Sequence, residues 1–259
     1  MADTTPNTAT ELSGRTALVT GSSRRIGKAI ALALAAAGAD VAVHGRTGRA
    51  EAEGVAEAIR ALGRRAVVVM GDVADPDQAA ALVAAAGEGL GGLDILVNNA
   101  SVRAKCDLEE MSWEEWRRIV GVTLDGAFLC AKAALPFLKR SPAGRIVNIG
   151  GGAGHAGAAH HVHVVAAKSG LLGVTKALAH DLGAFGITVN MVSPGLIEDE
   201  VDDPKRTAER REVYRLDRLP LRRPGTPDDV AAGVLALCHP RLGYVTGQTL
   251  HVNGGAFMP

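Results

Sequence analysis

The sequence predicts an α/β fold: a single doubly wound parallel sheet of seven strands flanked by helices. Short β-branched runs alternate with longer Ala/Leu-rich stretches from residue 14 almost to the C-terminus. Most of the short runs are continuously apolar, which is typical of parallel strands covered on both faces. Repeated strand–helix–strand units require right-handed crossovers, and no change in composition marks a second domain.

The individual elements follow from these runs and from their boundary residues. The expected strands are Thr16–Thr20, Asp40–His44, Ala66–Met70, Asp94–Val97, Arg145–Ile149, Thr188–Val192 and Thr249–Val252. The expected helices lie near 25–38, 50–62, 77–89, 113–139, 162–185 and 228–238. Asp75-Pro76 is typical of a helix start, while Gly38 and Gly63 stand where helices end.

Two segments fall outside this alternation. Residues 1–13 are polar, and we expect them to form a disordered tail before a domain that spans 14–259. Residues 194–227 form the only long irregular stretch, which is unusual inside a compact domain. We therefore expect this stretch to be a substrate lid.

Composition excludes several classes of function. The chain has 259 residues, and its 28 Lys and Arg balance 28 Asp and Glu, so neither a nucleic-acid footprint nor a polybasic membrane anchor is indicated. No apolar run approaches the roughly 18 residues that span a bilayer, which predicts a cytoplasmic protein without a membrane partner. Cys106, Cys130 and Cys238 are odd in number and far apart, so we expect small buried side chains rather than a disulfide or metal site.

The first strand runs into a glycine-bearing turn that opens an apolar helix. In an α/β fold of this Rossmann-like kind, backbone N–H groups at a helix N-terminus can hold a pyrophosphate, and glycine permits the close approach. The alternative is a tight connection that holds nothing. The expected cofactor contacts in the turn are Gly21, Ser23, Arg24, Arg25, Ile26 and Gly27.

The end of the second strand distinguishes between two dinucleotides. An NAD site needs an acidic side chain there for the ribose 2′-hydroxyl, but the chain reads His44-Gly45-Arg46. Arg46, together with Arg24 or Arg25, can instead pair with a 2′-phosphate. This pattern favours NADP(H) over NAD(H), with solvated surface arginines as the alternative.

Further motifs recur in order along the chain, and with them residues 12–255 resemble the short-chain dehydrogenase/reductase family. They are Thr20–Gly27, Gly71-Asp72-Val73, Asn98–Ser101, Asn148-Ile149, Ser193-Pro194-Gly195, Val245–Gln248 and Asn253–Gly255. The resemblance implies a small-molecule substrate and a homo-oligomer, a tetramer or dimer, built through helices 113–139 and 162–185. It also implies cofactor contacts at Asp72, Val73, Asn99, Lys168, Pro194, Gly195 and Ile197.

The family's usual catalytic set is largely replaced in this chain. The resemblance places a tyrosine four residues before Lys168, where this sequence has Val164. It places a serine at Gly151 and an asparagine at Thr123. Only the ribose-binding lysine remains, so the proton must come from a different group.

Histidines gather where the tyrosine is missing, and a histidine needs little tuning to exchange a proton at neutral pH. We expect His155 as the first candidate, then His163 and His161. The alternative is that they are polar loop residues bonded to water or backbone. His160, His161 and His163 are spaced too closely to converge on one metal ion, so no metal site is expected.

An acidic segment follows the sixth strand. Glu198, Asp199, Glu200, Asp202 and Asp203 form either a solvated loop or a lid for a cationic substrate or divalent ion. Three functions remain open at this stage. They are an NADP(H)-dependent oxidoreductase acting on a carbonyl or alcohol with Lys168 and a non-standard proton donor, a non-redox lyase or isomerase using His155, and a catalytically silent nucleotide-binding subunit.

Overall fold

The computed structural model describes residues 11–199, 211 and 215–259 of the chain. Seven parallel strands form one sheet in the order β3-β2-β1-β4-β5-β6-β7. The strands are β1 Thr16–Val19, β2 Asp40–Gly45, β3 Ala66–Met70, β4 Ile95–Asn98, β5 Arg145–Ile149, β6 Thr188–Pro194 and β7 Thr249–Val252. The predicted fold class is confirmed. The strand order reverses between β1 and β4, and such a switch point is where ligands bind in this architecture.

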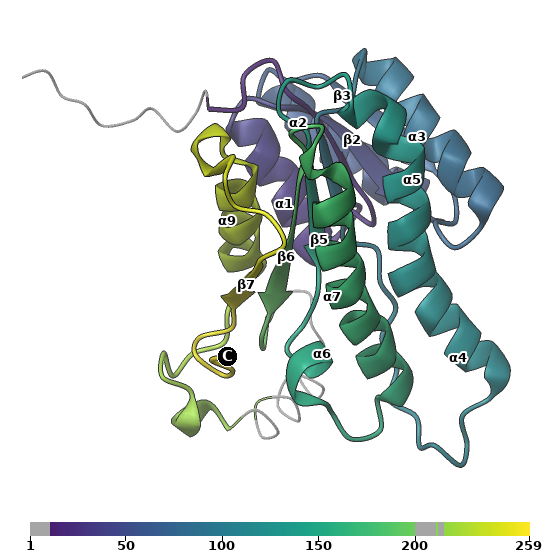
Figure 1. Cartoon of the computed structure of the whole chain (residues 1–259), viewed down its shortest axis with the longest axis vertical. Coiled ribbons are helices and arrows are strands. Elements are labelled where there is room, and N and C mark those ends of the chain that lie inside the picture. Colours follow the sequence, from purple (N-terminus) through teal and green to yellow (C-terminus); the bar gives the residue numbers. More distant parts are fainter. Residues whose placement is uncertain (1–10, 200–210, 212–214) are drawn as a thin grey trace, which may run out of the picture.

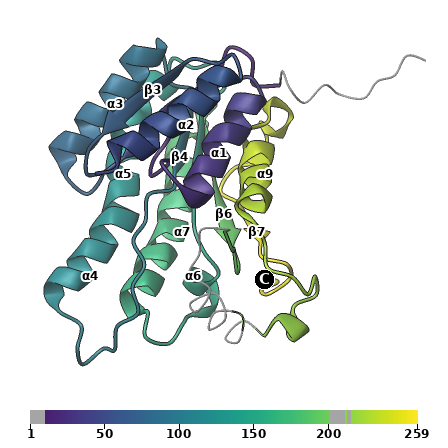
Figure 2. The same ribbon diagram turned by 180° about the vertical axis from the view of Figure 1, so that it is seen from behind.

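Helices cover both faces of the sheet (Figures 1 and 2). One face carries α1 (Arg25–Ala36), α2 (Arg49–Ala61) and α9 (Pro227–Cys238), which share a core of buried aliphatic side chains with the strands. The opposite face carries α3 (Pro76–Leu90), α5 (Gly126–Leu138) and α7 (Val162–Gly183) with a second core. The two cores fix the sheet between them and bring all carboxyl ends of the strands to one edge.

Local signals account for several boundaries. The Asp75 carboxylate accepts hydrogen bonds from the backbone N–H groups of Asp77 at 3.1 Å and Gln78 at 2.9 Å, so it caps α3 as predicted. Thr226 and Asp229 form a reciprocal capping box at the start of α9. Gly63 follows α2 with φ +76°, a left-handed conformation in which glycine carries no steric cost.

The helix expected over 113–139 is divided into three parts. It consists of α4 (Trp113–Val120), a π-helical turn (Gly121–Asp125) and α5. Such a turn inserts one extra residue per turn and re-aims the following side chains, and it is often found at functional sites. A short helix, α6 (Ala153–Ala156), also occurs where the sequence indicated only a loop.

The predicted N-terminal tail is too long. The side chain of Leu12 is 1% exposed within the first core, and its backbone N–H donates to the carbonyl of Ala37 at 2.8 Å. The disorder expected for residues 1–13 is therefore wrong at this end, because one apolar side chain is enough to anchor the chain to α1. Residues 1–10 lie outside the described part.

The cysteine prediction is also corrected at one position. Cys130 and Cys238 are buried, and burial raises the pKa of each thiol to about 12. Cys106 is only partly buried, in the loop between β4 and α4. The loop has no core to bury it, because its apolar neighbours are few.

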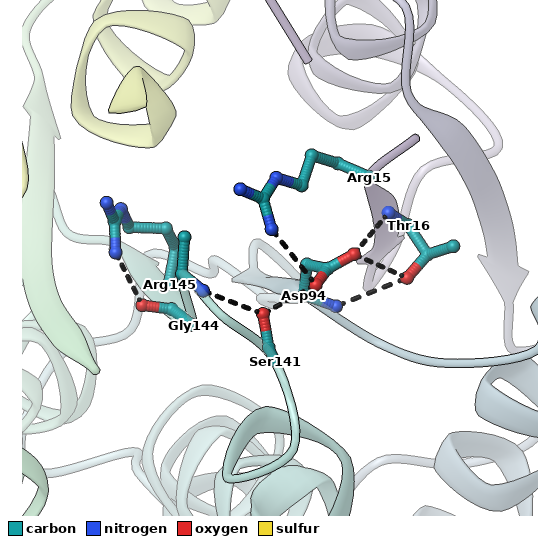
Figure 3. A network of polar contacts seen from close by, with 7 residues as sticks. Arg15, Thr16, Asp94, Ser141, Gly144 and Arg145 are labelled. Carbon is teal, nitrogen blue, oxygen red and sulfur yellow. Dashed lines mark hydrogen bonds and ion pairs between the residues drawn. The ribbon is translucent and has the colours of Figure 1, made fainter. Parts of the chain in front are cut away.

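Asp94 ties the amino ends of three strands together (Figure 3). Its carboxylate accepts hydrogen bonds from the Thr16 backbone N–H at 2.8 Å, from the Thr16 hydroxyl at 3.1 Å and from the Ser141 hydroxyl at 2.5 Å. Arg15 adds an ion pair at 3.6 Å. The network lies at the amino ends of β1 and β4, at the opposite end of the strands from the glycine turn, and therefore has a structural role.

Two helical stretches, Trp113–Leu138 and Val162–Gly183, have the length and hydropathy of a membrane span, with window means of 1.5 and 1.2. Half of the first window and a third of the second are buried inside the protein. Helices that pack on a sheet have the same composition, so this finding is weak evidence for a membrane.

Candidate active site

The turn between β1 and α1 contains two glycines whose backbone has no room for, or does not favour, a side chain. Gly21 adopts φ +64°, and a Cβ atom at Gly27 would lie less than 3.0 Å from the Gly21 carbonyl oxygen. Arg24 precedes α1 in an extended conformation, and its side chain makes no capping hydrogen bond. The N-cap side chain therefore does not occupy the start of α1, an arrangement that suits a pyrophosphate.

Two polar side chains hold this turn in place. His44 accepts a hydrogen bond from the Gly21 N–H at its Nδ1 atom (2.8 Å) and donates from Nε2 to the Gly71 carbonyl (3.0 Å). Burial lowers the pKa of His44, in keeping with a neutral ring. The Asn99 amide donates to the carbonyls of Thr20 at 2.8 Å and Gly21 at 3.0 Å. The backbone of the turn is thus fixed before any ligand arrives.

The residues expected at the adenosine end lie at the carboxyl ends of β2 and β3. Arg46 follows β2, is 59% exposed and forms an ion pair with Asp72 at 3.5 Å. Asp72 also accepts a hydrogen bond from the Ala74 N–H at 2.9 Å. Val73 is buried against Gly126 of α5. A guanidinium at this place can reach a 2′-phosphate, and the Asp72 pair keeps it close to the turn.

The other arginines and Ser23 of the turn surround the same opening. Arg24 and Arg25 are exposed, and Arg25 has φ +54°, unusual for a residue other than glycine. Ser23 and Ile26 are partly buried beside them. The structure thus brings all six residues predicted for the turn to one edge of the sheet.

The segment after β6 forms the opposite wall of this edge. The Pro194 carbonyl accepts a hydrogen bond from Gly152 at 3.0 Å, and the Gly195 N–H donates to Val252 at 3.0 Å. A Cβ at Gly195 would lie 2.8 Å from the Asn253 backbone, so only glycine fits without displacing it. Ile197 pairs with Gly225 beyond the segment that the structure leaves undescribed.

Lys168 lies on α7 beside the carboxyl end of β5. Its ammonium donates to the Ile149 carbonyl at the end of β5, at 2.7 Å. Burial, and to a smaller extent the charge of Arg103, lowers the pKa of Lys168 to about 8. Val164, one turn earlier on α7, is buried and has no polar side-chain atom. A Cβ at Gly151 would meet no atom within 4 Å, so the space of a serine side chain is open.

Thr123 occupies the π-helical turn. Its hydroxyl lies 3.3 Å from that of Ser101, which follows β4, and Thr123 itself is buried. A threonine is too short to replace an asparagine amide, but the pair places two hydroxyls at the floor of the site.

The four histidines near α7 do not converge. His155 lies on α6 and packs against His251 at 4.7 Å and Phe257 at 5.4 Å between ring centroids. His163 is fully buried, with its Nε2 atom 3.4 Å from the Glu115 carboxylate of α4. His161 precedes α7, and its Nδ1 atom donates to the Ala159 carbonyl at 2.6 Å. His160 bonds Asp107.

Burial lowers the pKa of His155 and of His161, which keeps both rings neutral at pH 7. Within the described residues no group of three or more His, Cys, Asp or Glu side chains suits a metal ion. The acidic segment is partly neutralised, since Glu198 pairs with Arg211 at 2.5 Å. Glu200, Asp202 and Asp203 lie outside the described residues, as does most of the central part of the predicted lid at 194–227.

Two residues of the site were not expected from sequence. His44 was assigned only as a strand end, although a histidine in a buried apolar strand is itself a signal of a required polar contact. Arg103 was not singled out, because nothing in its sequence context shows that the loop after β4 lies beside Lys168.

Three comparisons place the chain among known proteins. The family model described as Enoyl-(Acyl carrier protein) reductase matches residues 21–256. The 3-oxoacyl-acyl-carrier-protein reductase FabG of Staphylococcus aureus is 38% identical over 244 residues, covering 94% of this chain and 98% of that protein.

Two solved structures are similar over nearly the whole chain. A short-chain dehydrogenase/reductase variant from Serratia marcescens has 33% identity and a TM-score of 0.87, covering 95% of this chain and 99% of the other. A blue fluorescent protein from a metagenomic library, in complex with NADPH, has 38% identity and a TM-score of 0.88, covering 96% and 100%.

Proposed function

Because the chain belongs to the short-chain dehydrogenase/reductase family of oxidoreductases, we propose that it interconverts a carbonyl and an alcohol with NADP(H). The observation that carries the proposal is the uncapped N-terminus of α1, held open beside Gly21 by His44 and Asn99. The buried His44 and the partly buried Asn99 fix the backbone of this turn, which suits ligand binding better than a mere connection. The similar structure that contains NADPH supports the same cofactor.

The chain offers a place for each part of the cofactor. The N–H groups at Ile26 and Gly27 suit the pyrophosphate, and Arg46 with Arg24 suits the 2′-phosphate. Lys168 suits the ribose hydroxyls. The nicotinamide supplies hydride chemistry when bound, and the protein supplies position and a proton path.

We propose that Lys168 is the group that donates the proton to the substrate carbonyl. Its pKa of about 8 suits a donor that works near neutral pH, since a general acid is most effective when its pKa lies near the working pH. The position one turn before it carries Val164, which has no hydroxyl to compete as a donor. Of the predicted histidines, His161 is affected by the charges of Arg103 and Lys105 in the loop after β4, whereas His155 packs against His251 and Phe257. No contact of His155 favours the lyase or isomerase alternative.

The experiment is a titration of the purified protein with NADPH and NADH, followed by nicotinamide fluorescence and melting temperature. We expect NADPH to bind at least about tenfold more tightly, since its 2′-phosphate gains a charge-assisted bond to Arg46. Arg46→Ala should remove this preference and leave NADH affinity unchanged, while Arg241→Ala, at the far end of α9, is the matched control.

The outcomes separate the remaining functions. Binding of neither cofactor would contradict the proposal. NADPH binding without turnover of any ketone, aldehyde or alcohol would favour the silent nucleotide-binding subunit. The predicted homo-oligomer and cytoplasmic location belong to the same proposal, and sedimentation of the purified chain tests the oligomer directly.

A further inference from the structure

The loop from Asn99 to Ser112 lies across the substrate end of the site. It starts at Ser101, whose hydroxyl is 3.3 Å from that of Thr123 on the floor. It then reaches the segment before α7, where the Cys106 N–H donates to the His160 carbonyl at 2.9 Å. Arg103 and Lys105 lie between these two anchors and are exposed. Both cations are therefore held at the rim of the site rather than on a free loop.

Electrostatic effects agree with the placement of the loop by its two hydrogen-bonded anchors. The charge of Arg103 contributes, after burial, to the lowered pKa of Lys168. Arg103 and Lys105 also contribute, again after burial, to the lowered pKa of His161. Lys168 lies on α7 and His161 just before it, so both groups belong to the segment that the loop contacts.

The neighbouring carboxylates do not form ion pairs with these two cations. Asp107 bonds His160, and Glu115 faces His163 across α4 and α7. Within the described residues, Arg103 and Lys105 form no ion pair with any carboxylate, although their loop contains Glu109 and Glu110. Both side chains are exposed, so a ligand anion can pair with them.

At the same end of the site, the hydroxyls of Ser101 and Thr123 face each other at 3.3 Å. Gly151 and Val164 replace the two hydroxyl groups that the family uses there, and a Cβ at Gly151 would meet open space. A substrate held there must be oriented by other contacts. A guanidinium provides two parallel N–H donors that match the two oxygens of a carboxylate.

We propose that Arg103 and Lys105 form a carboxylate-binding subsite, so that the substrate of this enzyme is an oxo acid or its hydroxy acid. The proposal rests on the oxidoreductase function proposed above and specifies its substrate class. The carboxylate is held at the rim while the carbonyl points toward Lys168. A neutral ketone lacks this anchor.

The test uses pyruvate, acetoacetate and levulinate, which place the carboxylate at increasing distance from the carbonyl, each against its methyl ester. Titration calorimetry measures binding to the protein alone and to the protein saturated with NADPH. We expect at least one acid to bind about tenfold or more tightly than its ester. Arg103→Gln should abolish this difference and Lys105→Gln should reduce it. Arg241→Gln, which removes the same charge at the far end of α9, should retain it.

Each outcome decides one of the two proposals. Equal binding of every acid and its ester, or an undiminished difference in Arg103→Gln, overturns the subsite. Failure to bind NADPH overturns the oxidoreductase proposal, whereas the acid-to-ester ratio for the protein alone still decides the subsite. Unchanged melting temperature of Arg103→Gln establishes that a lost affinity is not a folding defect.

Discussion

Replacing Lys168 by methionine should stabilise the folded protein at neutral pH while abolishing turnover. The lysine carries its charge into a buried site, and this burial lowers its pKa to about 8, well below its ordinary value. Methionine fills a similar volume without a charge. Removal of a buried charge that has no carboxylate partner relieves its desolvation.

The magnitude follows from proton linkage. At about 1.4 kcal/mol for each pH unit, the lowered pKa corresponds to at most about 3 kcal/mol. Above about pH 8 the folded protein releases the Lys168 proton, while the unfolded chain keeps it to about pH 10.4. The free energy of unfolding therefore rises with pH between about pH 8 and pH 10.4. Below about pH 8 the buried Lys168 charge destabilises the folded protein by its full amount.

The lost hydrogen bond opposes this gain. The Lys168 ammonium donates to the Ile149 carbonyl, and removing the donor costs about 1 kcal/mol. Lys168→Met should therefore be more stable than the parent by about 2 kcal/mol at pH 7. Near pH 10.4 the advantage should disappear, leaving the variant less stable by about 1 kcal/mol.

The assay is urea unfolding of both proteins at fixed concentration between pH 7 and pH 10.4, with carbonyl turnover measured in parallel. Lys176→Met, on the exposed side of the same helix, controls for an added apolar side chain. A stability difference that stays constant across this range would refute the reasoning, because a purely structural effect of methionine does not follow proton release.

Two further predictions concern the turn and the sheet. Gly27→Ala should destabilise the protein by about 2 kcal/mol and weaken NADPH binding, because the new Cβ would lie against the Gly21 carbonyl. Gly54→Ala, whose Cβ would meet open space, should instead add up to about 1 kcal/mol, and calorimetric melting compares the two. Asp94→Ala should cost about 3 kcal/mol in urea unfolding, because it removes three hydrogen bonds. Its NADPH affinity should stay unchanged, and a loss of binding would contradict the separate role of this network.

The sequence alone was enough to predict the parallel sheet and the glycine turn after its first strand. Continuous apolar runs such as Ala66–Met70 are typical of strands in a sheet that is covered on both faces. The ends of the observed strands differ from the expected ends by at most two residues. Gly21 adopts a left-handed conformation that favours glycine, and Gly27 leaves no room for a Cβ beside the Gly21 carbonyl, so both match the prediction for the turn. The substitution of the catalytic positions at Val164, Gly151 and Thr123 stays a prediction.

Other features depended on contacts between distant segments. Leu12 lies beyond the alternating pattern, so its anchoring to α1 could not be read from the chain. The π-helical turn at Gly121–Asp125 leaves no mark in apolar spacing, because a single extra residue barely disturbs the period.

The histidines show the limit of sequence reasoning most clearly. His155, His161 and His163 lie close together in the sequence, but in the structure they contact different elements: His251 and Phe257, the Ala159 carbonyl, and Glu115 of α4. Helical rotation separates neighbours by about 100° per residue, so proximity in sequence does not give a shared site. Cys106 and His160 are 54 positions apart, and their backbones are hydrogen-bonded because the loop after β4 meets the segment before α7 in the folded chain.

Sequence by itself therefore determined the fold, since the strands and helices depend on periodicity and on local backbone requirements. The tertiary structure decided which loops and side chains lie side by side at the carboxyl edge of the sheet, because that depends on which strand ends the parallel sheet brings together.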